Sequence, residues 1–474
     1  MPRAARVMPR GHSVVTYLAK SIGAGLVGVV PPALLYFGLF AILGVDISGT
    51  AYLVTVVGIT LTTLLIWVEV ALSLRRRGPS PHPADQPWPT VSAIIAAYLP
   101  NEQATILDTL HAFAAVEYAG ERQVILAYNT PTDLPEVEAQ LHAFAASHPD
   151  FEVFRVPGST SKAQNVNAAL PQVRGEVLGI FDADHHPAPD SFDRAVSWIV
   201  DGAADIVQGR CVVRNGGETW SSRLVAVEFE QIYGVAHPGR AQMHGFGIFG
   251  GTNGYWRTDV LREITFDRSM LTEDVDSGMR ALRAGYRVVS DPQLVSYELA
   301  TTTFAGFWAQ RMRWAQGWFQ VSLRHTHPLL RRPGLSLRQR LGAAHLLFWR
   351  ELYPWLALQM WPIIAFWIYR YTVAGIDWNV MPFAALTALN LGTGPALVLV
   401  AWARADRSVQ VNWRWFLLAL VAAPFYSEVK NSICRIAQFK QLRGGQHEWV
   451  VTPRSVPTGS GSIGSVRAAA TAGA

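Results

Sequence analysis

The chain has 474 residues, of which 50% are hydrophobic and only 16% are charged, against about 25% charged residues in an average soluble domain. This composition excludes an intrinsically disordered chain and argues against an ordinary soluble enzyme. The formal net charge is +5, but no basic stripe with interleaved aromatic residues accompanies it, so nucleic acid is not an expected partner. The two cysteines, Cys211 and Cys434, are too few for a disulfide framework and show no metal-ligand spacing.

Two long apolar runs near the N-terminus predict a transmembrane hairpin. Ser21 to Val45 and Ala51 to Leu74, the second broken only by Glu69, each provide the ~20 residues that a spanning helix needs. Arginines lie before the first run and at positions 75–77 after the second. The positive-inside rule therefore predicts that both ends of the hairpin lie in the cytosol.

The C-terminal third contains further apolar runs. Leu352 to Tyr371 and Met381 to Trp402 are candidate spans. A shorter run, Phe416 to Ser427, fits either a span extended into its flanks or an interfacial helix. We therefore expect four or five spans in total. The tail after Thr452 is rich in Gly, Ser and Ala, a composition typical of disorder.

Between these regions, from Trp88 to about Asp291, the sequence is typical of a soluble α/β domain. Short β-type runs alternate with helical stretches, and the runs lie at 91–98, 123–129, 151–156 and 177–181. This alternation predicts a mostly parallel sheet with right-handed crossovers. In such sheets ligands bind at the carboxyl ends of the strands.

Asp182 and Asp184 follow the fourth of these runs, one residue apart. Carboxylate oxygens suit a hard cation such as Mg²⁺ or Mn²⁺ that carries a diphosphate. A D-x-D sequence alone is more often a solvated loop, but its place after a buried strand favours the metal site. We interpret His185 and His186 as neighbours of that site rather than ligands.

A second acidic motif, Thr272-Glu273-Asp274, opens a helical run that extends to Ala284. Alone it is typical of an N-terminal helix cap, because acidic residues in the first turn suit the helix dipole. The preceding stretch, residues 249–257, is dense in glycine. It fits either a simple loop or a backbone that approaches a ligand closely.

The segment from Phe304 to Arg324 has two opposite helical faces at 100° per residue. The polar face carries Gln310, Arg313, Trp314 and Gly317, and the apolar face carries Phe304, Trp308, Met312, Ala315 and Phe319. This pattern predicts an interfacial helix with its apolar side on the bilayer and Arg311 near lipid headgroups. Gln with Trp on the protein-facing side suits a sugar ring, which offers hydroxyls and a face for stacking.

Together and in this order, these features resemble the membrane-embedded processive glycosyltransferases, the cellulose, chitin and hyaluronan synthase group within glycosyltransferase family 2. The Gln310 to Trp314 segment matches the Q-x-x-R-W pattern of that group. The tail residues Trp449, Thr452 and Arg454 resemble its W-x-x-T-x-R gating loop. The resemblance implies an α/β GT-A (Rossmann-like) catalytic domain embedded between transmembrane helices, with a cytosolic C-terminus and an even number of spans.

The resemblance also implies roles for individual residues. Asp274, within Thr272-Glu273-Asp274, would be the general base, Asp184 would ligate Mg²⁺ or Mn²⁺, Asp182 would contact the nucleotide or the metal, Lys162 would face the donor, Arg313 would stabilise the departing diphosphate, and Gln310 and Trp314 would hold the acceptor. A base is needed because a sugar hydroxyl is a poor nucleophile near neutral pH.

One position departs from the group's pattern. After the second β run the group carries an aspartate pair that contacts uridine, but here Asn129 stands in the acidic place. An amide both accepts and donates hydrogen bonds, so the selectivity for the base is open. Asp133 would substitute only if its loop folds back.

These observations predict a multi-pass plasma-membrane protein with a cytosolic catalytic domain. The expected division is a basic cytosolic N-terminus at 1–20, a transmembrane hairpin at 21–74, the GT-A domain at 75–300, interfacial helices with the Q-x-x-R-W motif at 301–350, a transmembrane region at 351–434, and a cytosolic tail at 435–474.

The expected function is inverting, metal-dependent polymerisation of a nucleotide-activated hexose, with UDP-glucose favoured, into a β-linked polysaccharide that crosses the membrane. The expected partners are the nucleotide-sugar donor, the growing polysaccharide, the lipid bilayer and an accessory export subunit. One alternative is a non-processive enzyme that adds one sugar to a membrane lipid, as ceramide glucosyltransferases do. The other is a non-catalytic membrane scaffold, which the retained acidic motifs disfavour.

Overall fold

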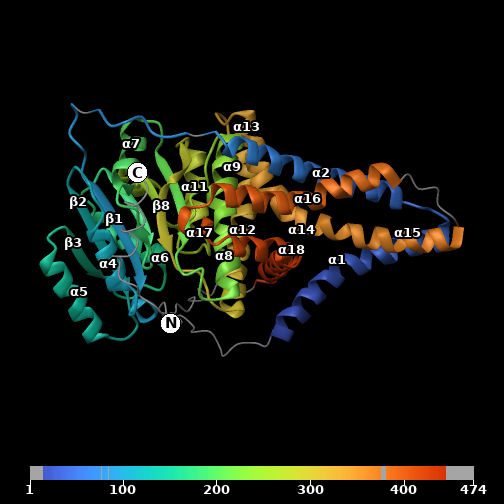
Figure 1. The fold of residues 1–474 in the computed structure, drawn as a ribbon, viewed down its shortest axis with the longest axis horizontal. Helices are drawn as coiled ribbons and strands as arrows, with labels where there is room; N and C mark the ends of the chain where they lie inside the picture. The colour runs from blue at the N-terminus through green and yellow to red at the C-terminus, as the bar shows by residue number, and fades with distance from the viewer. Residues whose placement is uncertain (1–13, 76, 84, 375–379, 445–474) are drawn as a thin grey trace.

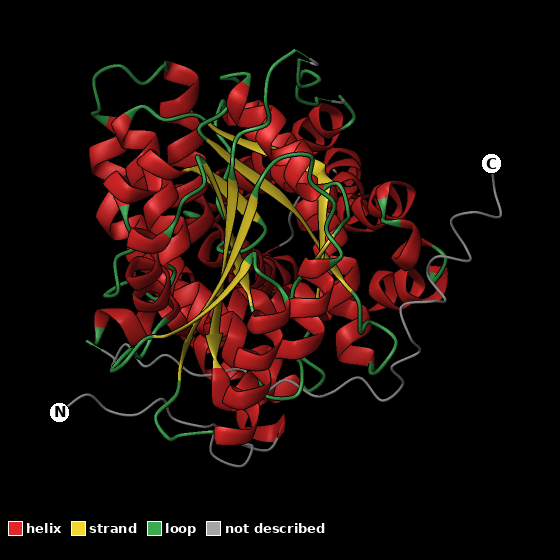
Figure 2. Ribbon diagram, turned by 90° about the vertical axis from the view of Figure 1, so that its left-hand side faces the viewer, coloured by secondary structure: helices red, strands yellow, loops and turns green. Residues whose placement is uncertain are grey.

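The computed structural model describes residues 14–75, 77–83, 85–374 and 380–444. An α/β domain forms one end of the molecule, and long helices from both ends of the chain extend away from it (Figure 1). The sheet lies inside the domain with helices on both of its faces (Figure 2). This arrangement buries the apolar strands between helices while the long apolar helices stay largely uncovered.

The first two helices match the predicted hairpin. They are α1 (Val14–Leu43) and α2 (Ser48–Ser73). Together with the segment Ala384–Arg404 they make three helices in the described part of the chain that are long and apolar enough to cross a membrane. By length and composition these helices are candidate membrane spans that flank the α/β domain.

The C-terminal helices depart from the predicted runs. They are α12 (Phe304–Leu330), α13 (Leu337–Ala343), η3 (Ala344–Trp349), α14 (Arg350–Leu356), η4 (Ala357–Gln359), α15 (Met360–Ala374), α16 (Val380–Arg404), α17 (Arg407–Gln410) and α18 (Trp413–Leu442). The predicted span Leu352 to Tyr371 is divided by the 3-10 turn η4, and Phe416 to Ser427 is the middle of the 30-residue helix α18. Neither is among the three candidate spans.

Eight strands form one sheet. They are β1 (Val91–Tyr98), β2 (Arg122–Asn129), β3 (Phe151–Arg155), β4 (Val177–Asp182), β5 (His186–Pro187), β6 (Ile206–Val213), β7 (Gly254–Arg257) and β8 (Val288–Glu298). Their order in the sheet is β3-β2-β1-β4-β7-β6-β8-β5. The strands β3, β2, β1 and β4 pair with one another in parallel, as the alternation of β runs and helices predicts.

The sheet as a whole is mixed, with four parallel pairings, the larger share as predicted, and three antiparallel ones that the sequence did not indicate. Strand β7 is antiparallel to both of its neighbours, β4 and β6, and β5 is antiparallel to β8. The short β7 lies within the glycine-dense stretch, where the sequence carries no apolar run that would mark a strand. Its insertion brings that stretch directly beside the end of β4.

Helices cover both faces of the sheet. They are α3 (Leu99–Glu102), α4 (Ile106–Ala114), α5 (Pro135–Ser147), α6 (Lys162–Ala169), η1 (Leu170–Gln172), α7 (Ser191–Val200), α8 (Trp220–Gln231), η2 (Ile232–Ala236), α9 (His237–His244), α10 (Thr258–Ile264) and α11 (Glu273–Ala284). One apolar core packs α4, α5 and α7 on one face, and a second packs α6, α10 and α11 on the other. Strands β1 and β2 are buried along nearly their whole length, as continuous apolar runs require.

Helix α12 is enclosed by protein along much of its length, which corrects the expectation that its apolar side rests on lipid. Phe307, Trp308 and Ala315 are buried in a cluster shared with α8, α16 and α18. The aromatic ring of Tyr17, from α1, also lies 4.9 Å from that of Trp308. Helix α12 therefore joins the α/β domain to the long terminal helices.

Candidate active site

A small polar pocket lies where strands β1, β2 and β4 end. It is lined by Ala96, Ala97, Tyr98, Glu102, Asn129, Lys162, Asn165, Asp182 and Ala183. The three strands are parallel and paired, so their carboxyl ends meet at one edge of the sheet. This edge is where ligands bind in open α/β sheets.

Lys162 connects the end of β4 to the glycine-dense loop. Its Nζ donates to Asp182 Oδ1 at 2.5 Å and to the carbonyl oxygen of Gly251 at 2.6 Å. The side chain of Lys162 is 12% exposed and that of Asp182 is 33% exposed, so the ion pair borders the pocket. An ammonium group held in this way can bind an anionic phosphate without first having to be ordered.

Asp184 lies behind this ion pair and is fully buried. Its Oδ2 accepts a hydrogen bond from the backbone N–H of Leu299 at 3.0 Å, which fixes the carboxylate. Asp182 and Asp184 thus present carboxylate oxygens at the end of β4, the ligand type that Mg²⁺ and Mn²⁺ prefer. The residues present fit a hard divalent cation.

The glycine-dense loop is a shaped structure and brings a third carboxylate to the same place. Gly251 has a φ of +89°, and a Cβ on it would lie 2.6 Å from Asp274 Oδ2. Asn253 also has a positive φ, of 48°, and its side chain donates to the backbone of β6 and β8. Only glycine allows Asp274 to approach the loop so closely, so Lys162 and Asp274 meet on either side of Gly251.

The Thr272-Glu273-Asp274 motif lies at the start of α11, as predicted, but capping does not account for it. The Thr272 side chain makes no cap hydrogen bond to α11. Burial raises the pKa of the Asp274 carboxyl, against the opposing effect of a backbone N–H and of the Lys162 and Arg313 cations. Burial and the neighbouring Asp274 together raise the pKa of Glu273. A carboxylate with a raised pKa is a stronger proton acceptor than an ordinary one.

Helix α12 packs its Q-x-x-R-W face against the segment that precedes Asp274. A Cβ on Gly317 would lie 2.5 Å from Thr272 Cγ2, so glycine is required for this contact. Gln320 Oε1 accepts from the backbone N–H of Leu271 at 3.1 Å. Arg313 Nη1 reaches the Leu271 carbonyl at 3.5 Å. The Arg313 face of α12 and the acidic motif are thereby brought together.

Arg311 has a role different from the expected contact with lipid headgroups. It is buried, it pairs with Glu228 of α8 at 2.5 Å, and its guanidinium lies 4.2 Å from the centroid of the Trp314 ring. Glu228 also accepts from Tyr426 and Lys430 of α18. This buried network fixes the Trp314 ring and ties α12 to α18.

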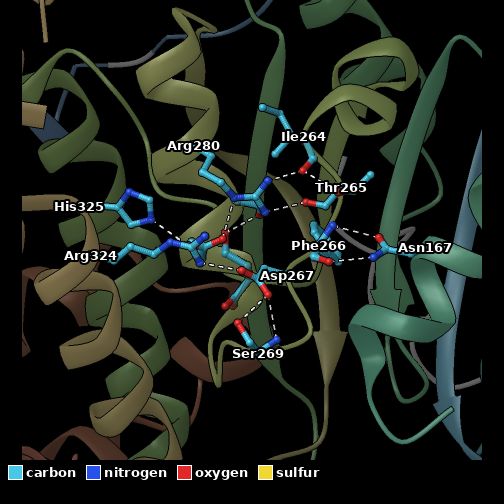
Figure 3. Close-up of polar contacts among 12 residues, drawn as sticks. Asn167, Ile264, Thr265, Phe266, Asp267, Ser269, Arg280, Arg324 and His325 are labelled. Atoms are coloured by element: carbon cyan, nitrogen blue, oxygen red, sulfur yellow. Dashed lines mark hydrogen bonds and ion pairs between the residues drawn. The ribbon is translucent and has the colours of Figure 1, made fainter. Parts of the chain in front are cut away.

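A second polar network fixes α11 to α12. Asp276, fully buried one turn after the start of α11, accepts from Arg280 at 2.8 Å and from His325 at 2.8 Å, and pairs with Arg324 at 3.2 Å. Figure 3 shows Arg280, Arg324 and His325 converging from the two helices. Because Asp276 lies two residues after Asp274, the network holds the carboxylate-bearing turn in register with α12.

The loop before Thr272 is fixed by hydrogen bonds to α12 and α6. Asp267 accepts from Arg324 at 2.7 Å and from the Ser269 hydroxyl at 2.7 Å. The Asn167 side chain, on α6, exchanges two hydrogen bonds with the backbone of Phe266 (Figure 3). The loop is therefore anchored to the two helices that carry Lys162 and Arg313.

Asn129 lines the pocket, but both ends of its side chain are engaged. Its Oδ1 accepts from Asn165 Nδ2 at 2.8 Å, and its Nδ2 donates to the Ser159 carbonyl at 3.0 Å. Asn165 also donates to the Ala97 carbonyl at the end of β1. The amide thus joins the end of β2 to α6 and to the loop that holds Ser159, where a carboxylate would need different partners.

The domain itself matches a known family. Residues 89–317 match the family described as glycosyltransferase like family 2. The chain carries a family 2 glycosyltransferase domain. The match begins just before β1 and ends at Gly317, so it includes both acidic motifs and the Q-x-x-R-W segment.

Relatives of this glycosyltransferase domain include polysaccharide synthases. The chain is 31% identical over 315 residues to the UDP-forming cellulose synthase catalytic subunit of Xanthomonas axonopodis pv. citri, covering 63% of this chain and 40% of the relative. It is 24% identical over 249 residues to the poly-beta-1,6-N-acetyl-D-glucosamine synthase of Staphylococcus epidermidis, covering 52% and 59%. The chain thus spans less than two thirds of the length of either relative.

The fold of the glycosyltransferase domain is also found in a solved structure. The mannosyltransferase PcManGT from Pyrobaculum calidifontis, in complex with GDP-Man and Mn²⁺, aligns with a TM-score of 0.51 at 20% identity, over 78% of this chain and 97% of that one. This likeness shows a GT-A-like fold, here with a mixed sheet and flanking apolar helices.

Of the predicted residues, Asn129, Lys162 and Asp182 line the pocket of the glycosyltransferase domain, and Asp133 does not. The Asp133 carboxylate is 77% exposed and pairs with Arg155 at 2.7 Å, so it does not replace the missing acidic group beside Asn129. The tail residues Trp449, Thr452 and Arg454 lie outside the described residues. Gln310 lies on α12, one turn before Trp314.

One carboxylate of the pocket was missed by sequence reasoning. Glu102 lines the pocket, is 5% exposed and accepts from the Asn101 side chain at 3.0 Å. Asn165 lines it beside Asn129. The rule that led to Asp182, that polar side chains at the carboxyl end of a buried strand face the ligand, would have identified Glu102 four residues after β1.

Proposed function

We propose that the chain is an inverting glycosyltransferase that extends a β-linked polysaccharide from a nucleotide-activated hexose and passes the product across the membrane. The single observation that carries this proposal is the meeting of Lys162 and Asp274 at Gly251, beside the carboxylates that end β4. A phosphate-binding cation and a proton acceptor within one small site suit a displacement at a sugar phosphate.

In this mechanism Asp274 accepts the proton of the acceptor hydroxyl as the hydroxyl attacks the anomeric carbon. A positioned general base contributes about 10²–10⁴-fold in rate. The C1–O bond to the diphosphate breaks as the new C1–O bond forms on the opposite face, so the configuration inverts. Burial and the negative charge of Asp274 raise the pKa of the adjacent Glu273 carboxyl, so Glu273 is the more readily protonated of the two and Asp274 retains the negative charge.

We assign binding of the leaving diphosphate to the residues on the Lys162 side of Gly251. Lys162 and Arg313 are the cations that act on the acidic motif, and we assign them to the charge on the departing group. Asp184 and Asp182 would hold Mg²⁺ or Mn²⁺, which when bound supplies positive charge to the same oxygens. Asp182 is kept oriented by its ion pair with Lys162.

Processive extension is supported by the elements around α12. Helix α12 packs extensively on α18, and α18 also contacts α1 and α16. Trp314, held by Arg311, offers a ring for stacking of a sugar at the junction of domain and helices. The named relatives include synthases of two different polysaccharides. We therefore assign Trp314 and Gln310 to the acceptor terminus.

We favour UDP-glucose as the donor, in keeping with the UDP-forming cellulose synthase among the relatives. Asn129 makes one hydrogen bond at each end of its amide, so a second lone pair on Oδ1 and a second hydrogen on Nδ2 remain, and the amide can accept from one base or donate to another. The donor panel must therefore include UDP-glucose, UDP-N-acetylglucosamine and GDP-mannose.

The test uses purified full-length protein in nanodiscs with Mn²⁺ or Mg²⁺ and each radiolabelled donor, with Asp274→Asn as the blank. Product size is read by chromatography and linkage by digestion with specific hydrolases. High-molecular-weight product from one donor is expected. Label that stays with extracted lipid would replace polymerisation by single addition to a lipid. Donor binding without any transfer would overturn the catalytic proposal.

A further inference from the structure

A buried group of three potential metal ligands lies beneath the D-x-D turn. His185 follows Asp184, Cys211 lies on β6 and Glu298 ends β8. Their ligand atoms all lie within 4.8 Å of one another. His185 and Cys211 are fully buried, and the Glu298 side chain is 15% exposed. The sequence alone gives no sign of this group, because the three residues are widely separated in the chain.

The donor set suits a borderline-soft cation. Imidazole nitrogen, thiolate sulfur and carboxylate oxygen are the three ligand types of Zn²⁺, which binds them in tetrahedral sites. One thiolate and one carboxylate balance the charge of a divalent ion. By contrast, the carboxylates of Asp182 and Asp184 suit the harder Mg²⁺ or Mn²⁺.

The surrounding hydrogen bonds prepare the imidazole for this role. His185 Nδ1 lies 3.0 Å from Ser296 Oγ, and its Nε2 lies 3.2 Å from Glu298 Oε2. A ligating histidine commonly donates its other ring N–H to a fixed acceptor, which orients the ring. Ser296 supplies that acceptor, and leaves Nε2 directed at Glu298.

We propose that His185, Cys211 and Glu298 form a second divalent-metal site, selective for Zn²⁺ or Co²⁺ and separate from the site expected at Asp184. On binding, Cys211 Sγ, His185 Nε2 and a Glu298 oxygen coordinate the ion and the thiol proton leaves to solvent. The partly exposed Glu298 provides the point of entry. The fourth position is taken by water, as in zinc sites with three protein ligands.

Occupancy of this site must act on Asp184. The site holds the residue after Asp184, and Leu299, the residue after Glu298, donates its backbone N–H to Asp184 Oδ2 at 3.0 Å. A metal that joins the β4–β5 turn to β6 and β8 therefore braces the Asp184 carboxylate from two sides. We expect the bound metal to stabilise the domain against thermal unfolding.

The experiment titrates Co²⁺ into chelator-treated, detergent-solubilised full-length protein and follows the near-ultraviolet absorption of a thiolate-to-cobalt bond. The chain offers a matched control, because it has one other cysteine, Cys434. Wild type and Cys434→Ser are expected to bind one Co²⁺ per chain with this absorption. Cys211→Ser should lose it, and Glu298→Gln should bind more weakly by more than the 10–100-fold that loss of a second-shell partner costs.

A thermal readout keeps the inference independent of enzymatic activity. Zn²⁺ should raise the Tm of wild type and Cys434→Ser but not of Cys211→Ser, each checked for native elution volume. Loss of the cobalt signal in Cys434→Ser, or its absence from folded wild type, would show that His185, Cys211 and Glu298 are only a hydrogen-bonded cluster. If Cys211→Ser does not fold, Glu298→Gln, which preserves size, decides the question. Failure of sugar transfer alone bears on the proposed function and not on this site.

Discussion

At the scale of single residues, Gly251 organises the proposed centre. Its carbonyl accepts from Lys162, and its missing side chain admits Asp274. Because φ is +89°, any other residue there would also adopt a left-handed backbone conformation, which destabilises the fold by about 1–3 kcal/mol. The role of Gly251 could not be predicted from the sequence, because the carboxylate that it contacts lies more than twenty positions later in the chain.

Gly251→Ala should therefore lower the rate of transfer about 10²-fold while the fold persists. A Cβ would lie 2.6 Å from Asp274 Oδ2, and a displacement of about 1 Å in a catalytic group costs about 10²-fold in rate. Gly202→Ala is the matched control, because Gly202 also has a positive φ, of 65°, but no atom within 4 Å of the built Cβ. Initial rates and Tm of both variants test this. Equal rates in the two variants would contradict the role of the close approach.

The raised pKa of Asp274 predicts the acid limb of the pH profile. Asp274 must be ionised to accept a proton, and burial raises its pKa, so activity is lost as the pH falls through that raised value. A plot of log kcat/KM against pH should therefore bend at a pH above the ordinary aspartate pKa of about 3.9. Below that bend it should fall with a slope of one. Glu273→Gln removes the second titrating carboxylate, so the limb of that variant should report a single ionisation, that of Asp274.

The pH profile can also contradict the role of Asp274 as general base. Asp274 and Glu273 titrate as a pair, so the apparent values in wild type belong to both groups. Rates measured from acid to neutral pH, with donor binding checked at each end, would contradict the assignment if they stayed constant down to the ordinary aspartate range. Asp133→Asn, at an exposed carboxylate outside the pocket, should leave the profile unchanged.

At the scale of elements, the contact between α11 and α12 unites the acidic motif with the Q-x-x-R-W face. Gly317→Ala would place a Cβ 2.5 Å from Thr272 Cγ2 and 2.9 Å from its backbone nitrogen. Overpacking of this kind costs about 1–3 kcal/mol, so Tm and activity should both fall. Gly392→Ala in α16, where no neighbour lies within 4 Å, should be neutral or slightly stabilising. Chemical or thermal unfolding in detergent measures both; a harmless Gly317→Ala would refute the close packing.

Much of the sheet could be predicted because local sequence determines it. Strands β1 to β4 lie within one residue of the predicted runs, since β1, β2 and β4 are centred on apolar segments and β3 mixes apolar and charged residues as a half-buried strand does. Strand β7 could not be predicted, because Gly254–Arg257 is short and its pairing with β4 is non-local. The same holds for Arg311, whose partner Glu228 lies 83 positions away. A sequence pattern shows the faces of a helix but not what covers them.

At the scale of the whole molecule, an ion pair with a buried carboxylate and a partly buried guanidinium joins a candidate span to the domain. Glu69 on α2 receives two hydrogen bonds from Arg240 on α9, at 2.8 and 2.9 Å. In the sequence Glu69 was merely an interruption of an apolar run. Gly239 packs against the backbone of Glu69, since a Cβ there would clash with its carbonyl. Domain and membrane helix are therefore rigidly joined at this point.

Removal of one partner should destabilise more than removal of both. Glu69→Gln leaves the Arg240 charge unpaired and Arg240→Met leaves the Glu69 charge unpaired, a loss that approaches the ~3–5 kcal/mol of a fully buried pair, whereas the double variant leaves no unpaired charge. We expect the largest fall in Tm in the single variants and partial recovery in the double. Strictly additive losses would mean that the two side chains do not depend on each other.

The central claim is that Asp274 acts on the acceptor while Lys162, Asp182 and Asp184 act on the donor. The most direct measurement compares donor binding and transfer in Asp274→Asn and Asp182→Asn, using radiolabelled UDP-sugar and Mn²⁺ with protein in nanodiscs. Asp274→Asn should bind donor as wild type does and lose about 10²–10⁴-fold in transfer, whereas Asp182→Asn should lose donor binding itself. Equal loss of donor binding in both variants, or normal transfer by Asp274→Asn, would contradict the account.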